Sequence, residues 1–137
     1  MTASTLARTS FQNTLSELFA LLADSNGVPV ASLASAGVVK VFPHEPGATG
    51  WLHPCSVTIS PTAIEPTDWV VTVRVYVAGK VLPAAAQDLL LDSTVVVGDL
   101  LFDGVGYGPD RWAFGWVDGL DCWVASSEVT VGREDGF

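Results

Sequence analysis

The chain is poor in charged residues, and above all in bases. Charged residues make up 15% of its 137 positions, and six Lys and Arg stand against 15 Asp and Glu, for a formal net charge of −9. An acidic surface of this kind repels phosphate, so we expect no tight or sequence-specific binding of nucleic acid. The hydrophobic share of 49%, combined with low charge, also excludes a disordered chain.

Cysteine and histidine are equally scarce, which limits the chemistry that the chain can perform. The two cysteines, Cys55 and Cys122, form neither a disulfide framework nor a paired metal motif, and they favour a reducing compartment. The histidines are His44 and His53, and a structural zinc site needs four ligands at paired short spacings. No serine stands in a G-x-S-x-G nucleophile motif. We therefore predict no catalytic, metal or cofactor site, and hence a protein that is not an enzyme.

Long apolar runs are missing as well. The longest, residues 89–102, is interrupted by Asp92, Gly98 and Asp99, and it is shorter than the roughly 18 residues that cross a bilayer. The first residues lack the basic and apolar regions of a signal peptide. We expect no membrane association.

The sequence contains periodic apolar patterns, and its length predicts a single domain over residues 1–137. Phe11, Leu15, Leu18 and Leu22 follow a helical period. Val71, Val73, Val75 and Val77 alternate along a strand with one buried face. These patterns predict an α+β fold, with a mainly antiparallel β-sheet packed against an N-terminal helix and a central helix. The expected elements are helices at 6–23 and 84–102 and strands at 38–42, 55–60, 69–77, 111–117 and 122–131.

Some boundaries stay open at this level. Residues 28–36 favour a loop or short irregular link because of Pro29 and the small residues around it. Pro61 is expected to end the second strand. The stretch 94–98 is β-branched and ends in Gly98, so it could be a strand or a break between two helices. Residues 127–137 are predicted to form the terminal strand and a charged tail.

Acidic residues are concentrated in one part of the chain. Between positions 88 and 121 there are seven acids and one base, Arg111. Two explanations are open: the acids keep an apolar protein soluble, or they line a passage that DNA traverses without sticking. The acids are Asp88, Asp92, Asp99, Asp103, Asp110, Asp118 and Asp121.

The Gly-rich region that follows residue 103 holds a cluster of aromatic residues. Trp112, Phe114 and Trp116 alternate, which places them on one face of a strand, and Trp123 lies on the next strand. Large aromatics of this kind form either a core wall packed on the helices or an anchor between protein subunits. The candidate interface residues are Arg111, Trp112, Phe114, Trp116, Trp123 and, in the charged tail, Arg133.

The order of these segments resembles that of tail terminator proteins of long-tailed bacteriophages, in particular those that infect actinobacteria. The similarity is one of layout and covers most of the chain: the amphipathic start at 11–22, the V-V-K-V-F-P run at 38–43, the strand ending at Ser60-Pro61, the D-W-V-V-T-V-R-V-Y-V run at 68–77, an Ala- and Leu-rich helix, and the V-G-R-E-D close at 131–135.

This resemblance implies a structural protein of the virion neck, assembled in the host cytoplasm. Such a protein forms a ring, expected to be a hexamer, that caps the tail tube and joins it to the head connector. Its partners are the major tail protein and the connector or stopper protein, while DNA passes through the ring without specific binding. The stretch 104–123 is more elaborate than the family's closing strands, so a head-completion or stopper protein is an alternative. A small ligand-binding module or enzyme, with Asp110 or Asp118 beside the aromatic residues, is a third.

Overall fold

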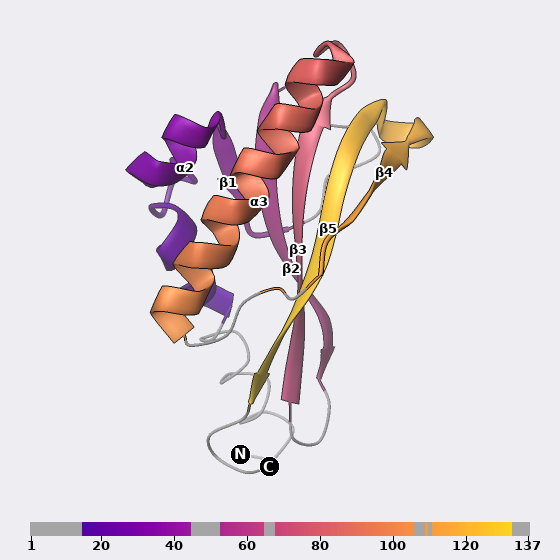
Figure 1. Ribbon diagram of the computed structural model, residues 1–137. Coiled ribbons are helices and arrows are strands. Elements are labelled where there is room, and N and C mark those ends of the chain that lie inside the picture. Colours follow the sequence, from indigo (N-terminus) through magenta and orange to yellow (C-terminus); the bar gives the residue numbers. More distant parts are fainter. Residues whose placement is uncertain (1–14, 45–52, 65–67, 106–108, 110, 133–137) are drawn as a thin grey trace.

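The computed structural model describes residues 15–44, 53–64, 68–105, 109 and 111–132 (Figure 1). It confirms the α+β class: a five-stranded sheet with strand order β1-β2-β3-β5-β4 is covered on one face by helices. The strands are β1 (Lys40–Phe42), β2 (Cys55–Ile64), β3 (Asp68–Ala78), β4 (Ala113–Val117) and β5 (Cys122–Gly132).

The sheet is mixed rather than wholly antiparallel. β1 pairs with β2 in parallel, whereas β2–β3, β3–β5 and β5–β4 are antiparallel pairs. The long connection between β1 and β2 permits parallel pairing, whereas a tight hairpin would force the two strands to run in opposite directions. β1 and β4 form the two edges of the sheet.

Pro61 does not end the second strand, contrary to the sequence prediction. β2 continues to Ile64, with an irregularity in its pairing to β3 between Pro61 and Ala63. β1 pairs only with residues 56–58 of β2, so the outer side of β2 has no described strand beside it at Pro61. A proline is tolerated there because no ladder partner on that side requires its missing N–H.

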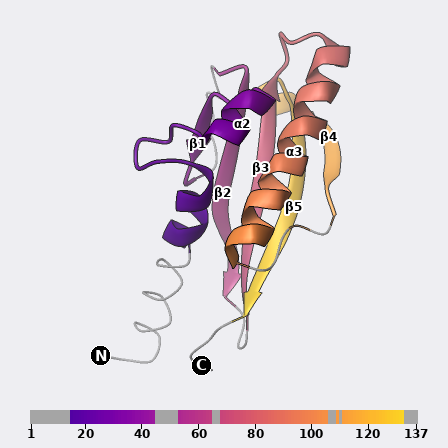
Figure 2. The ribbon, with the colours of Figure 1, turned by 60° about the vertical axis from the view of Figure 1, so that its left-hand side comes forward.

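The central helix α3 (Pro83–Val105) runs unbroken through the ambiguous stretch 94–98 (Figure 2). Its residues Val97 and Leu101 are fully buried. The Thr94 hydroxyl donates a 2.9 Å hydrogen bond to the Leu91 carbonyl oxygen. Burial of these side chains outweighs the weak helix propensity of β-branched residues.

The N-terminal half holds two shorter helical pieces. Residues 15–22 are helical, and their Leu18 and Leu22 are fully buried in the core; the first part of the predicted helix lies outside the described residues. The stretch 28–36, expected to be a loop, contains helix α2 (Ala31–Ala36), which buries Leu33 and ends at Gly37 with a φ of 108°. A six-residue helix without a marked apolar stripe is held by this burial rather than by propensity.

The core lies between α3 and the sheet. Val71, Val73, Val75 and Val77 of β3 are fully buried against the helices, as their alternation predicted. The opposite face of β3 is less exposed than in a strand with only one buried face, because Thr72 and Tyr76 are also buried there. β3 is the middle strand of the sheet, so both of its edges are paired with neighbouring strands.

Candidate functional site: an apolar surface beside helix α3

Edge strand β4 carries two of the aromatic residues singled out in the sequence. Phe114 pairs with Ala125 of β5 and Trp116 pairs with Trp123, so both side chains lie on the sheet face that α3 covers. The helix does not reach over this edge: Phe114 is 52% exposed and Trp116 is 41% exposed. The Trp116 and Trp123 rings meet edge to face, with centroids 4.8 Å apart and an angle of 72° between their planes.

The remaining predicted interface residues separate into different environments. Trp112 precedes β4 instead of belonging to it, and it packs half-buried against the core, as does Trp123. Arg111 is exposed, and its backbone oxygen accepts a hydrogen bond from the Ser127 hydroxyl. Arg133 lies outside the described residues. Partial burial therefore supports the core-wall explanation for Trp112 and Trp123, whereas the exposed Phe114 and Trp116 stay candidates for an anchor between subunits.

One flank of α3, which begins at the groove residue Leu91, adds exposed apolar residues that the sequence did not single out. Leu91, Val95 and Phe102 are 45%, 63% and 61% exposed. Their spacings of four and seven place them on one side of the helix, turned away from the buried stripe of Leu90, Val97 and Leu101. A second apolar stripe beside the core stripe was the signal that could have found them.

A groove separates the helix from the edge strand. It has a cavity volume of about 440 Å³ and is lined by residues of both elements, with the Gln87 side chain as the polar exception. We call the groove and the exposed apolar residues closest to it the α3–β4 surface: Leu91, Val95, Phe114, Trp116 and Trp123. The lining residues of the groove itself are Pro83, Ala86, Gln87, Leu90, Leu91, Phe114, Gly115 and Trp123.

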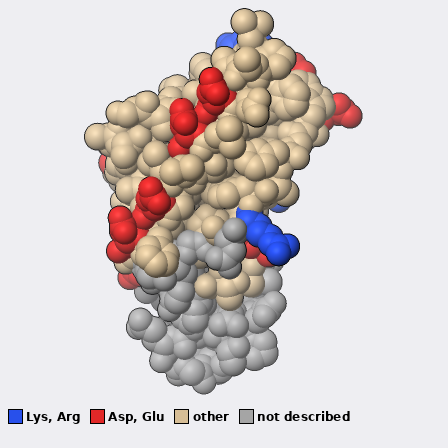
Figure 3. All heavy atoms as spheres, viewed as in Figure 1, with Lys and Arg blue, Asp and Glu red and all other residues tan. Residues whose placement is uncertain are grey.

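A row of acids follows the solvent side of α3. Asp88, Asp92, Asp99 and Asp103 are all exposed, and their spacings of four, seven and four place them on one face of the helix. Acidic side chains form a diagonal row across the molecular face shown in Figure 3, along the path that α3 takes in Figure 1. The helix thus has a buried side, an apolar flank and an acidic ridge.

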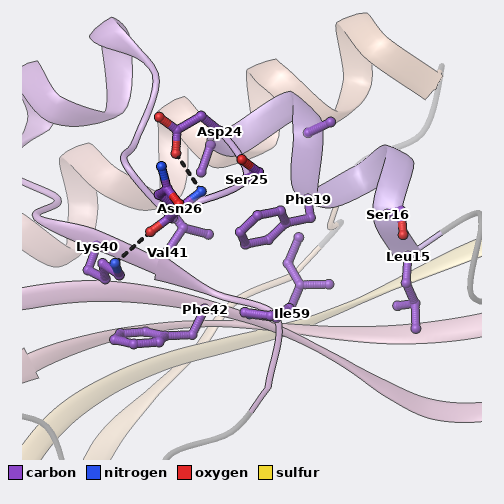
Figure 4. Close-up of a pocket in the computed structure, with 14 residues that line it drawn as sticks. Leu15, Ser16, Phe19, Asp24, Ser25, Asn26, Lys40, Val41, Phe42 and Ile59 are labelled. Carbon is purple, nitrogen blue, oxygen red and sulfur yellow. Dashed lines mark hydrogen bonds between the residues drawn. The ribbon is translucent and has the colours of Figure 1, made fainter.

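A second cavity, of about 630 Å³, lies at the other edge of the sheet (Figure 4). Its wall is a tightly bonded loop: the Asp24 carboxylate accepts hydrogen bonds from the backbone N–H groups of Asn26 and Val28, and Lys40 Nζ donates one of 2.6 Å to the Asn26 oxygen. Gly27 has a φ of 79° and packs against the Val41 backbone. The two charged side chains of the cavity wall, Asp24 and Lys40, are thus hydrogen-bonded within the chain.

The cysteines are poor candidates for nucleophilic chemistry. Burial raises the pKa of the Cys55 thiol to about 11, an effect that its contact with the Ser93 hydroxyl, 3.8 Å away, only partly offsets. Burial, and then the charge of Asp121, raise the pKa of Cys122. A thiol with a raised pKa holds little thiolate at neutral pH, and the thiolate is the reactive form.

The two histidines both lie near one aromatic ring. His44 and His53 are each 5.8 Å from the Phe42 ring, measured between centroids. Among the described residues no group of three or more His, Cys, Asp or Glu side chains is placed to hold a metal ion. In the same part of the chain, no helix is long and apolar enough to cross a membrane.

Comparison of the chain with protein-family models and with curated proteins returned no match. The function is therefore argued from the surface described above and from the layout of the sequence.

Proposed function

We propose that the chain is a structural protein of a bacteriophage neck, a tail terminator that caps the tail tube as a ring and joins it to the head connector. The observation that carries the proposal is the α3–β4 surface, where exposed Phe and Trp side chains of the edge strand and exposed Leu and Val side chains of the helix border one groove. The layout of the sequence, which resembles that of tail terminators, supplies the choice among assembly proteins.

Apolar exposure of this kind is a liability for a subunit that works alone. Large contiguous apolar patches on soluble proteins mark interaction sites, and an uncovered edge strand such as β4 invites pairing with other chains. Trp and other large aromatics dominate the energetics of protein interfaces because their burial removes much apolar area from water. Phe114 and Trp116 have this character, and they stand on an edge strand.

The charge of the chain fits a place beside DNA without specific contact. The net charge of −9 repels a phosphate backbone. A DNA channel requires such repulsion, since bound phosphates would slow the passage of the genome. A ring subunit also needs two different contact patches, because its head-to-tail interface joins unlike surfaces.

The test is electron microscopy of phage particles made without this chain. Overlong tails detached from heads are expected, because termination of the tail tube is lost. Tails of normal length together with heads that leak DNA would assign the chain to the stopper role instead. Normal infectious particles would refute both structural roles.

A matched pair of variants links that phenotype to the surface. Phe114→Ser with Trp116→Ser should reproduce the defect of the missing chain, whereas Val28→Ser with Val39→Ser should support normal assembly. The control valines are 55% and 49% exposed, as open as the aromatic residues, but they lie outside the α3–β4 surface. Circular dichroism of the purified variants checks that both pairs fold.

A further inference from the structure

Acidic and apolar residues are interleaved along α3 in a regular way. Each exposed apolar residue of the flank stands three positions after an acid: Leu91 after Asp88, Val95 after Asp92, and Phe102 after Asp99. Residues three apart on a helix are surface neighbours. A segment seated on the apolar flank therefore meets a line of carboxylates along one border.

The other described charges near this surface leave that balance acidic. Asp121 lies next to Trp116, since both approach Gly79, and Asp118 begins the short helical turn η1 (Asp118–Leu120) that follows β4. Among the described residues, the bases that are nearest in sequence to α3 and β4 are Arg111, just before β4, and Lys80, just after β3. Six acids, four on the ridge and two beside the end of β4, thus outnumber two bases.

A second copy of this chain is poorly matched to the surface. The chain has six bases in all, and among the described residues none lies on a helix: 15–22, α2 and α3 contain no Lys or Arg. Lys40 in β1 already donates its ammonium group to the Asn26 oxygen.

We propose that the α3–β4 surface docks an amphipathic helix of a different protein, with large apolar residues on one face and Lys or Arg beside them. The groove between α3 and β4 would receive apolar side chains at helical spacing, as other helix-binding grooves do, and the ridge would pair with the flanking bases. The inference rests on the proposed assembly role, in which a tail or connector protein supplies this helix. Contacts between ring subunits then use other parts of the chain.

The test uses the full-length protein and a synthetic helical peptide of about 18 residues, long enough for five turns. The peptide carries Leu on one face and Lys on the rest, with a fluorescent label for anisotropy. A second peptide has the same Leu positions and Glu in place of Lys. Saturable binding of the Lys peptide is expected, weakened at least about fivefold when ionic strength rises from roughly 0.05 to 0.5 M, and binding of the Glu peptide is expected to be about tenfold weaker or worse.

Two pairs of variants separate the site from general charge attraction. Asp88→Asn with Asp92→Asn should lower the affinity for the Lys peptide about fivefold. Glu17→Gln with Glu128→Gln removes the same charge from exposed sites elsewhere and should leave that affinity unchanged. Leu91→Ser should lower the affinity for the Lys peptide about tenfold, while the melting temperature of the protein stays within a few degrees of the original.

Several results would overturn the inference: no saturable binding, equal binding of the Glu peptide, or equal weakening by the two charge-removing pairs. Sedimentation that shows self-association of the protein, abolished by Leu91→Ser, would assign the surface to a second copy.

The peptide assay is independent of the phage experiment. If tails are overlong yet the Lys peptide fails to bind, the assembly role stands and the partner chemistry is wrong. If the peptide binds yet particles are normal, the docking site stands without the role.

Discussion

Two valines, two positions apart on α3, should differ clearly in how much the same substitution changes the free energy of unfolding. Val97 is fully buried, whereas Val95 is 63% exposed on the apolar flank. Val97→Ala removes two buried methyl groups, worth about 1.6 kcal/mol of transfer free energy, and leaves a cavity that adds about 1 kcal/mol. The higher helix propensity of alanine offsets about 0.5 kcal/mol of this loss in the free energy of unfolding. We expect the free energy of unfolding to fall by about 2 kcal/mol.

Val95→Ala should leave the free energy of unfolding within about 0.5 kcal/mol of the original value, or raise it slightly, because it loses little buried area and gains helix propensity. Urea unfolding followed by circular dichroism measures both variants, and calorimetry should show a melting temperature about 7 °C lower for Val97→Ala. If Val95→Ala costs as much as Val97→Ala, the flank of α3 is packed within the monomer. The reasoning that makes it a docking surface would then be refuted.

Further predictions concern close packing and buried thiols. A Cβ on Gly79 would lie 2.6 Å from the Asp121 backbone oxygen and 2.8 Å from the Trp116 ring, so Gly79→Ala should lower the free energy of unfolding by about 1–3 kcal/mol and change the tryptophan fluorescence. Gly98→Ala, where a Cβ meets nothing within 4 Å, should instead stabilise α3 by about 0.5–1 kcal/mol; a loss of similar size in both variants would contradict the packing argument. Because the folded-state pKa of Cys55 is about 11, above the ordinary 9.0, the unfolded thiol ionises first and stability should decline from pH 9 to about 11. Urea titrations at both ends of that window should show the decline reduced in Cys55→Val, and an equal decline in the variant would mean that other groups cause it.

Local periodicity was enough to predict most of the elements. The alternation in 69–77 predicted β3 and its buried face, and the helical stripes in 84–102 predicted α3 almost to its ends. Where prediction failed, neighbours distant in sequence decided. Pro61 lies within β2 because β1 is too short to pair with it, and α2 forms because Leu33 has a core to enter. The parallel pairing of β1 with β2 likewise depends on partners that no local pattern names.

The candidate site shows the same division more sharply. Composition alone established an acidic chain with few cysteines, histidines and bases, and alternation alone put Phe114 and Trp116 on one face of a strand. Whether that face was core or surface depended on how far α3 extends over the sheet, which is a property of packing. The helix covers Ala125 and leaves the β4 edge open, so Trp112 became half-buried and Phe114 exposed. Periodicity fixes which side chains share a face, because it is a property of the backbone; only the assembled layers decide which of those faces still meets water.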